Sequence, residues 1–324
     1  MTRSSAPGKI LLAGEYAVLE GGAAVVMAVN RRARAWFEPP ATPPSPFLAA
    51  AARVLAAELG ADSPAARAAA SLRVDTGALA AESGEKLGLG SSAAATVAGL
   101  AVCLGCDGTA VDVALLHRLA HRAHGDAQAA LDPAARGSGA DVAASVRGGV
   151  LLLEPGKTGD APPVATPLAL PPALELVPVW TGQPADTREL VAAVKRLADR
   201  DRPAYSACLI PISDAAVALA SACRAGAADR AVAAVAAGGL AVRDLGRAAG
   251  IELFLDSLQA LAEQASELGG ALKPTGAGGG DIALAAFTDP RAAQQFRAHA
   301  AGAGMPALDL RVDPRGAALE DDSA

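Results

Sequence analysis

The sequence is poor in aromatic side chains, which account for 3% of its 324 residues. Surfaces that bind single-stranded nucleic acid stack bases on such side chains, so their scarcity argues against that function. The formal net charge of −6 argues in the same direction, because nucleic acids attract basic proteins. We therefore expect no nucleic-acid partner. If the ligands of this acidic chain carry phosphate groups, the cations that hold them must be concentrated in one place.

Cysteines and long apolar runs are also scarce. Four cysteines give no disulfide framework in a chain of this length, which favours a reduced, cytoplasmic location. Cys103 and Cys106 have the spacing of a redox or zinc motif, but they lie in a predicted helix and no second ligand pair accompanies them. The longest alanine- and valine-rich stretch, Ala231–Val242, is too short to cross a membrane. Glu15 interrupts the apolar run near the N-terminus, which argues against a signal peptide, and we expect no membrane partner.

The chain has the composition of a folded protein, with 52% hydrophobic and 19% charged residues. Its length allows either one large core or two lobes. Residues 155–172 carry many prolines and few periodic apolar residues, and we interpret them as the linker between two lobes. The predicted units are therefore 1–165 and 173–315, followed by a tail at 316–324. The chain is expected to fray from Pro314 onwards.

Patterns of apolar residues predict the main helices and strands. Two short strands are expected on either side of a turn at residues 14–16, and the proline-rich segment 39–46 is expected to be a loop. Helices are expected over Ala49–Leu59 and Ala93–Leu104, from Glu189, and over about 211–226, 229–248, 254–269 and 290–302. Further strands are expected over Leu72–Val74, Val150–Glu154, Leu174–Trp180, Ile282–Phe287 and Leu308–Val312.

The stretch 85–96, which reads EKLGLGSSAAAT, is the most informative part of the chain. Gly88 and Gly90 allow the backbone to approach a ligand, and Ser91 and Ser92 stand where a helix is expected to begin. A helix N-terminus offers unpaired N–H groups and a partial positive charge, so it binds anions. Serine hydroxyls there could cap the helix or ligate a magnesium ion carried by a phosphate. We interpret the stretch as the phosphate-binding loop of a small-molecule kinase, with an ordinary loop and capped helix as the alternative.

Two other phosphate-binding motifs fit this stretch less well. It contains no Walker A sequence, Gly-x-x-x-x-Gly-Lys-Ser/Thr. It does match Gly-x-Gly-x-x-Ala from Gly88 to Ala93, which resembles a dinucleotide-binding fingerprint. That fingerprint requires a buried apolar strand before it, whereas residues 82–86 are polar and turn-like. A dinucleotide site is therefore the weaker interpretation.

Charged residues at unusual positions are further candidates for a site. Lys9 and Glu15 lie inside otherwise apolar segments, and Asp141 follows a glycine-rich turn. The alternative for the first two is a strand-end charge that faces solvent. The alternative for Asp141 is a helix N-cap. Thr187 and Arg188 stand at the start of a predicted helix and form a second possible anion site.

Three histidines share one face of a predicted helix. His117, His121 and His124 fall at i, i+4 and i+7, a spacing that could hold a metal ion. Arginines at positions 118 and 122 lie beside them and would repel a dication. We therefore interpret this face as a partly exposed helix surface rather than a metal site.

Three glycine-rich signatures, taken together and in this order, resemble those of the GHMP kinase superfamily. They are Pro7–Tyr16, Gly88–Ala94 and Thr275–Asp281, the last within a stretch whose many glycines suit a backbone lying against a ligand. Within the superfamily the chain is most similar to the phosphomevalonate kinase family. The details that favour this family are Gly14-Glu15-Tyr16, the motif at 138–143, the segment Trp180–Thr187, and Asp281 after the last glycine motif. Asp186 and Thr187 depart from that family's pattern, because they replace a pair of serines.

The resemblance implies an α+β fold with two lobes, an N-terminal ribosomal-protein-S5-like lobe and a C-terminal ferredoxin-like lobe, with the active site in the cleft. It implies ATP and Mg²⁺ as cofactors, Lys9 and Asp141 as the catalytic pair, and Ser92 or Ser91 as the residue that reaches Mg²⁺. The implied ATP-binding residues are Lys86, Gly88, Leu89, Gly90, Ser91, Ser92, Ala93, Gly276, Ala277, Gly278 and Gly279. The implied acceptor-binding residues are Glu15, Tyr16, Ser138, Gly139, Arg147, Thr187, Arg188, Gly280 and Asp281.

The reaction implied by the resemblance is the ATP-dependent phosphorylation of 5-phosphomevalonate to 5-diphosphomevalonate. A phosphate monoester is largely deprotonated at neutral pH, so such an acceptor needs no strong general base. Positioning and charge neutralisation should then dominate catalysis. Lys9 would bridge the two phosphates, and Asp141 would orient both Lys9 and the acceptor. Candidate cations for the acceptor's own phosphate are Arg147, Arg188 and Lys195.

Several alternatives remain open from the sequence. Mevalonate kinase, homoserine kinase and a related ATP-consuming decarboxylase belong to the same superfamily. A non-catalytic metabolite sensor could use the same fold, and an NAD-binding oxidoreductase is the alternative from another fold. The expected partners are ATP and a small phosphorylated acceptor, and the protein is expected to be a cytoplasmic monomer or homodimer.

Overall fold

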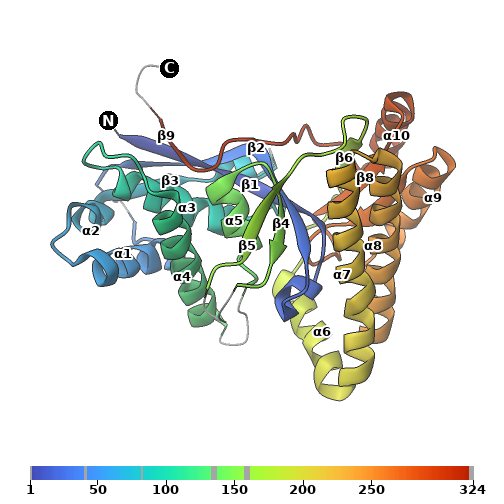
Figure 1. Cartoon of the computed structure of the whole chain (residues 1–324), viewed down its shortest axis with the longest axis horizontal. Helices are drawn as coiled ribbons and strands as arrows, with labels where there is room; N and C mark the ends of the chain where they lie inside the picture. Colours follow the sequence, from blue (N-terminus) through green and yellow to red (C-terminus); the bar gives the residue numbers. More distant parts are fainter. Residues whose placement is uncertain (1, 40–41, 82, 133–136, 157–160, 321–324) are drawn as a thin grey trace.

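The computed structural model describes residues 2–39, 42–81, 83–132, 137–156 and 161–320. Two antiparallel sheets form its framework, and each is packed against its own group of helices (Figure 1). Helices α1–α5 accompany the first sheet, and α6–α10 accompany the second. This confirms the expected α+β class with two lobes.

The first sheet has the strand order β5-β4-β2-β1-β9, and β3 also pairs with β2. Its long central hairpin consists of β1 and β2, whose buried halves cross the core. The turn between them contains the short 3₁₀ helix η1. The elements are β1 (Arg3–Ala13), η1 (Ala17–Glu20), β2 (Ala24–Phe37), β3 (Leu72–Asp75), β4 (Val150–Glu154), β5 (Val164–Leu168) and β9 (Ala318–Glu320).

Helix α3 lies against β1 and β2 and is almost entirely buried. Many of its buried residues are alanine or glycine, and these small side chains let the helix pack close to the sheet without leaving voids. α4 and α5 pack beside it. The helices of this unit are α1 (Pro46–Leu59), α2 (Pro64–Ala68), α3 (Ser91–Leu104), α4 (Val113–Leu131) and α5 (Ala140–Arg147), with the 3₁₀ turns η2 (Ala69–Ser71) and η3 (Gly77–Leu79).

The second sheet has the order β6-β8-β7, and α8 packs against β7 and β8. α8 also forms a long helical hairpin with α7 (Figure 1). Phe287 and Phe296 meet in the core of this unit at a ring-centroid distance of 5.3 Å. The elements are β6 (Glu175–Trp180), α6 (Thr187–Arg200), α7 (Arg202–Ala225), α8 (Ala228–Ala249), η4 (Asp256–Leu258), α9 (Gln259–Glu267), β7 (Ala271–Pro274), β8 (Ile282–Phe287) and α10 (Pro290–Gly302).

Apolar packing is continuous between the two units. The largest apolar cluster runs from Val25 and Met27 of β2 to Ala216 and Leu219 of α7 and Ile282 of β8. α7 is also the one helix in the described part of the chain that is long and apolar enough to cross a membrane. It packs against α8, β1 and β2.

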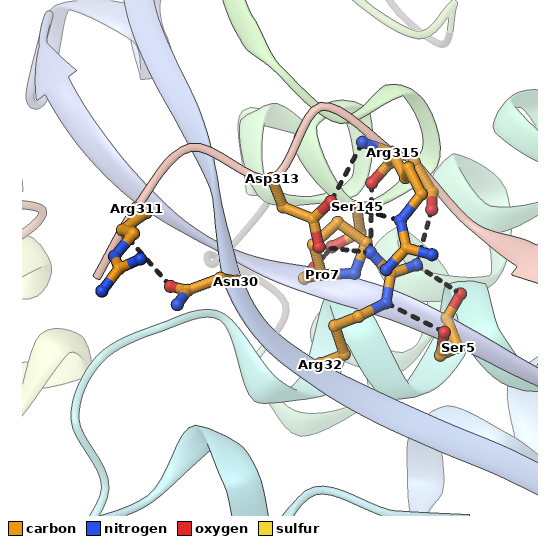
Figure 2. A network of polar contacts seen from close by, with 9 residues as sticks. Ser5, Pro7, Asn30, Arg32, Ser145, Arg311, Asp313 and Arg315 are labelled. Atoms are coloured by element: carbon orange, nitrogen blue, oxygen red, sulfur yellow. Dashed lines mark hydrogen bonds and ion pairs between the residues drawn. The ribbon is translucent and has the colours of Figure 1, made fainter. Parts of the chain in front are cut away.

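The C-terminal segment corrects two of our expectations. The predicted strand at 308–312 is not formed; this part of the chain has isolated bridges from Ala307 to Val179 and from Val312 to Val29. The chain does not fray at Pro314, because β9 pairs with the start of β1. Arg32 of β2 anchors the segment by an ion pair to Asp313 at 2.6 Å and by hydrogen bonds to the carbonyls of Arg315 and Gly316 (Figure 2).

The segment 155–172 also differs from the expected linker, because β5 lies within it and pairs with β4. Prolines at both ends of that strand masked its short apolar pattern. Parts of three predicted loops, at 40–41, 157–160 and 321–324, lie outside the described residues. The other predicted elements are confirmed, but some of their bounds differ. α6 begins two residues earlier than expected, and α7 begins nine residues earlier and contains Pro211. The helix expected over about 254–269 consists of η4 and α9.

Candidate active site

An irregularity in β1 brings Lys9 to the predicted phosphate-binding loop. The register with β2 shifts between Pro7 and Gly8, where proline lacks the N–H that a regular ladder uses. The Pro7 carbonyl instead accepts a hydrogen bond of 2.7 Å from Ser145 Oγ of α5 (Figure 2). A Cβ on Gly8 would lie 2.8 Å from the carbonyl oxygen of Leu89, so glycine is required for this close approach. The Pro-Gly-Lys motif thereby joins β1, α5 and the loop.

Lys9 is held by the loop through two backbone carbonyls. Its N–H donates to Leu89 at 2.9 Å, and its Nζ donates to Gly88 at 3.2 Å. The stem of the side chain lies across Gly90, where a Cβ would be 3.2 Å from both Cγ and Cε of the lysine. Lys9 is half-buried and has no carboxylate in ion-pair contact among the described residues. Its ammonium group is therefore available to an anionic ligand.

Two helices begin beside Lys9, and both start from a glycine in the left-handed conformation. The N-caps Gly90 of α3 and Gly139 of α5 each have φ of 74° and make no side-chain cap. Side chains of serine or aspartate cap six other helices in the described part of the chain, namely α1, α2, α4, α6, α7 and α10. Among the described residues the first N–H groups of α3 have no partner, and such groups favour anions such as phosphates. At the start of α5, Ser138 Oγ and Asp141 Oδ1 already accept from the N–H groups of Ala140 and Val142.

The serines at the start of α3 do not cap it, so one of the two roles expected for them is wrong. Ser91 and Ser92 are its first two residues. Ser92 Oγ lies 3.1 Å from Nε2 of His124 in α4, and that nitrogen lies 3.8 Å from Oδ2 of Asp141. His124 is 2% exposed and stacks on Phe47. A buried imidazole thus joins the loop's serine to the predicted catalytic carboxylate.

Asp141 lies in the first turn of α5 and is not its N-cap, which excludes the alternative role considered for it. Its Oδ1 accepts a hydrogen bond of 2.9 Å from the N–H of Val142, and its side chain is 22% exposed. A Cβ on Gly90 would lie 3.4 Å from the Cβ of Asp141 and 3.2 Å from the Lys9 stem. The predicted catalytic pair therefore meets across Gly90.

The loop Gly276–Gly280, between β7 and β8, reaches the site from the second unit. Its glycines have positive φ angles, and a Cβ on Gly280 would lie 2.9 Å from the backbone of residues 183–185. The hydroxyl of Tyr16, in the turn after β1, donates to the carbonyl of Ala277 at 2.7 Å. Burial and the neighbouring Glu15 raise the pKa of the Tyr16 phenol, so it stays protonated and can donate. The first and third signatures are therefore in direct contact.

Asp281 extends from the end of this loop to the phosphate-binding loop. Its φ is 55°, and its Oδ1 accepts a hydrogen bond of 3.1 Å from the N–H of Ala185. A Cβ on Gly88 would lie 2.8 Å from its Cγ, so the two loops touch at a position that admits only glycine. Burial raises the pKa of Asp281, while the Ala185 N–H and the charges of Lys9 and Lys86 act in the opposite direction. Lys86 thus lies at the same site, on its exposed rim.

Thr187 and Arg188 lie at the start of α6 with exposed side chains. The helix start is near the third glycine loop, because a Cβ on Gly279 would lie 2.8 Å from a methyl carbon of Leu190. However, Asp186 caps this helix, because its Oδ1 accepts hydrogen bonds of 3.1 Å from the N–H groups of Arg188 and Glu189. An anion bound there would have to displace the chain's own carboxylate.

Glu15 does not face solvent at a strand end, which corrects the alternative considered for it. It is 1% exposed and forms an ion pair with Lys273 of β7, which is 0% exposed. Lys273 was not anticipated. The signal in the sequence was a lysine between Leu272 and Pro274, in an apolar strand at the entrance to the glycine-rich stretch.

Arg147 is not brought together with the other predicted residues. It is exposed in the last turn of α5, six residues and therefore about 9 Å along the helix from Asp141. Burial together with the charges of Arg147 and His121 lowers the pKa of His117, in α4, to about 4. The role of Arg147 in binding an acceptor is thus not supported, because it lies at the opposite end of the helix.

A cavity of about 690 Å³ adjoins the site on the side of α4 and the turn after β1. Predicted residues Ser138 and Gly139 line it, together with His124 and the basic side chains Arg118 and Arg122. Arg118 also pairs with Glu58 at 2.7 Å. The cavity has room for a small polar molecule, and His124 connects its wall to Asp141.

On the histidine face of α4, His117 and His124 are buried, at 3% and 2% exposure, whereas His121 between them is partly exposed. Within the described ranges no three His, Cys, Asp or Glu side chains are grouped to hold a metal ion. Cys103 and Cys106 are free thiols, and burial raises the pKa of both, to about 12 for Cys103. A raised pKa is the opposite of what a reactive thiolate requires.

These residues fit a Mg²⁺ that arrives with a nucleotide better than one bound by the protein alone. Mg²⁺ is typically held by substrate phosphates and one or two protein oxygens. Ser92 and Asp141 offer such oxygens, and both contact the same imidazole. With Lys9, two uncapped helix starts and the loop of the second unit, the site can neutralise and orient closely spaced phosphates.

Comparisons with known proteins agree with this geometry. A phosphomevalonate kinase of Streptomyces sp. (strain CL190) is 31% identical to the chain over 222 residues, which cover 63% of this chain. The match spans 58% of that relative's length. No family model matches the sequence.

Solved structures match nearly the whole chain. The Lin0012 protein from Listeria innocua has a TM-score of 0.84 at 24% identity, with 99% of both chains covered. Streptococcus pneumoniae phosphomevalonate kinase, in complex with phosphomevalonate and AMPPNP, has a TM-score of 0.78 at 20% identity, covering 97% of this chain and 100% of that one. L. major mevalonate kinase in complex with R-mevalonate has a TM-score of 0.69 at 18% identity, covering 97% and 96%. The chain therefore has the GHMP kinase fold, and the resemblance seen in the sequence is confirmed at that level.

Proposed function

We propose that this protein transfers the γ-phosphoryl group of ATP to 5-phosphomevalonate, giving 5-diphosphomevalonate and ADP. The observation that carries the proposal is the position of Lys9, whose ammonium group lies among the phosphate-binding loop, two uncapped helix starts and Asp141. The Streptomyces relative and the S. pneumoniae complex support this choice of acceptor and nucleotide.

In the proposed reaction, an oxygen of the acceptor's phosphate attacks the γ-phosphorus, and the bond to the ADP oxygen breaks. The acceptor oxygen is already an anion at neutral pH, so no proton has to be removed. The obstacle is repulsion between two polyanions, which a bridging cation reduces. Lys9 is that cation, because the described residues give its Nζ a carbonyl partner and no ion pair.

The remaining predicted residues have supporting roles. The N–H groups of Ser91, Ser92 and Ala93 hold the triphosphate at the start of α3, and the loop 276–280 covers it from the second unit. Asp141 orients Lys9 and the acceptor. Ser92 would help to hold a Mg²⁺ bound with ATP, and that ion would neutralise charge on the ATP oxygens.

The acceptor occupies the cavity that Ser138 and Gly139 line. Arg118 and Arg122, at its wall, are better placed to meet the carboxylate end of the acceptor than Arg147. They replace Arg147, Arg188 and Lys195 as our candidates for binding the acceptor's anionic groups. We further propose that the protein works in the cytoplasm, as a monomer or homodimer, without nucleic-acid or membrane partners.

The alternatives make different demands on Asp141. In a mevalonate kinase the acceptor is an alcohol, so Asp141 would have to act as a general base. A non-catalytic metabolite sensor would bind ligands without transferring phosphate. A decarboxylase would release CO₂.

Phosphate transfer from ATP to a panel of acceptors tests the proposal. The panel comprises mevalonate, 5-phosphomevalonate and homoserine, with ADP formation and the phosphorylated product both measured. We expect turnover with 5-phosphomevalonate, little with the two alcohols, and no CO₂. Preferential turnover of mevalonate or homoserine, or nucleotide binding without transfer to any acceptor, would contradict it.

A further inference from the structure

The pair of Glu15 and Lys273 is an unusual feature for the centre of a protein. The two residues are 258 positions apart in the sequence, and their side chains are 1% and 0% exposed. The ammonium group of Lys273 donates to Oε1 of Glu15 and, at 2.8 Å, to the carbonyl of Pro274. The second carboxylate oxygen, Oε2, is buried without a hydrogen-bond partner in the part of the chain that the structure describes.

Helix α8 is shaped to accommodate this lysine. A Cβ on Gly239 would lie 3.2 Å from the Cβ of Lys273, and one on Gly238 would lie 3.6 Å from its Cε. Two successive glycines inside a helix are unfavourable by about 1 kcal/mol each relative to alanine. Here Gly238 and Gly239 let β7 approach α8, and the Lys273 side chain fits in the space that their missing side chains leave.

Stability alone does not account for the pair. Taking two charges out of water costs more than their attraction returns unless both are fully hydrogen-bonded, and Oε2 is not. Apolar side chains of similar volume would fill the same space without this cost. A role in geometry is the remaining explanation.

The pair connects the two ends of the proposed site. Glu15 lies in the turn after β1, directly before Tyr16, which donates to Ala277 of the third glycine loop. Lys273 lies at the end of β7, three residues before that loop, and holds the carbonyl of Pro274. Two links, one ionic and one from Tyr16, therefore fix the loop of the second unit relative to the strand that carries Lys9.

We propose that Glu15 and Lys273 are positioning residues for phosphoryl transfer, and that their ion pair holds the loop 275–281 in register with the phosphate-binding loop. The pair touches no reacting atom and acts through the loop that carries Asp281. The effect of the pair on kcat rests on the proposed function. Its effect on the order of the loop does not depend on which acceptor is used.

The test compares Glu15→Gln, Lys273→Met and the double variant. Each single variant leaves one buried group unpaired and is expected to lower Tm by about 5–10 °C. The double variant removes both charges and is expected to recover most of that loss. Its kcat should nevertheless stay at least about tenfold below that of the unmodified protein, because the loop is no longer fixed. Recovery of both Tm and kcat to within twofold would overturn the proposal.

Hydrogen exchange of residues 275–281 provides a readout that is independent of catalysis. We expect faster exchange there in the double variant, and also in Glu15→Gln alone, which keeps the shape of the side chain. Unchanged exchange in both would overturn the positioning role whatever the acceptor panel shows. Asp313→Asn is the matched control, because it also neutralises a carboxylate, the one that forms an ion pair with Arg32. It should leave the hydrogen exchange of 275–281 unchanged. Absence of phosphate transfer by the unmodified protein would overturn the proposed function instead.

Discussion

Two lysines, one on each side of the site, occupy opposite environments. Lys9 of β1 is half-buried, and its ammonium group donates to one backbone carbonyl at 3.2 Å. Lys273 of β7 is fully buried and is bound to a carboxylate and a carbonyl of the chain itself. The first has charge to offer a ligand, whereas the charge of the second is already neutralised. The sequence pattern places both lysines in apolar strands and does not distinguish them. The groups that each ammonium contacts in the structure do.

The comparison separates binding from architecture. A cation with free donors beside uncapped helix starts suits a site that concentrates phosphates in a protein of net charge −6. A cation paired with a carboxylate from another part of the chain joins two elements. Removing the lysine at position 9 should therefore mainly lower activity, whereas removing the lysine at position 273 should mainly lower stability.

Lys9→Met should give the largest loss of activity. We expect kcat/KM for phosphate transfer to fall at least about 1,000-fold, because a cation that neutralises a transferring phosphoryl group contributes that much or more. Tm should change by only a few degrees, since no carboxylate loses its partner. Steady-state kinetics and thermal unfolding of the same preparation check both. A variant that loses stability but keeps its activity would break the distinction between the two lysines.

Lys273→Met should give the largest loss of stability. Removing it leaves Glu15 as a buried, unpaired charge, and the free energy of unfolding should fall by about 3–5 kcal/mol. Denaturant unfolding monitored by circular dichroism measures this. Asp313→Asn, in the ion pair that fixes the C-terminal segment (Figure 2), is the comparison variant. Its effect should be smaller, because Arg32 is 12% exposed and keeps its hydrogen bonds to Ser5 and Gly316. An equal effect would mean that burial does not distinguish the two pairs.

His117 extends the comparison to a buried base that has no carboxylate partner among the residues that the structure describes. Its pKa in the folded protein, about 4, lies below the ordinary value of 6.5, so the unfolded chain binds the proton more tightly. Stability should therefore decrease as the pH falls through the range from 6.5 to 4, by up to about 3 kcal/mol. The stability of His117→Gln should depend less on pH over this range. Parallel pH profiles for the variant and the unmodified protein would contradict this assignment.

Asp141→Asn should have the smallest effect of the four substitutions, and the property that it changes is the catalytic rate. If the acceptor is a phosphate, Asp141 orients groups rather than removing a proton, so kcat should fall about 10- to 100-fold, less than with Lys9→Met. The ratio of the two losses, measured with 5-phosphomevalonate, is the informative quantity. A greater loss with Asp141→Asn would indicate a general base and favour an alcohol acceptor.

Much of this site was predictable because its determinants are local. Glycines that need a positive φ, such as Gly90 and Gly139, and the Pro7-Gly8-Lys9 motif are visible as sequence patterns. Their grouping followed from the resemblance to known kinases, and the structure brings Lys9, Asp141, Gly88 and Asp281 together.

The parts that were missed depend on contacts between distant residues. Lys273 meets Glu15 across 258 positions, and His124 meets Ser92 across 32. Neither contact has a periodic signature. Arg147 is not brought together with the other predicted residues for a related reason, since it is near Asp141 in sequence but lies at the other end of a short helix. β9 was missed because its three residues are a strand only through pairing with β1.

The most direct test of the account is a crystal structure with a non-hydrolysable ATP analogue and 5-phosphomevalonate bound together. We predict that the triphosphate lies at the start of α3, under the loop 276–280, and that Nζ of Lys9 contacts both the γ-phosphate and the acceptor's phosphate. A triphosphate bound elsewhere, or a Lys9 side chain directed away from both phosphates, would contradict it.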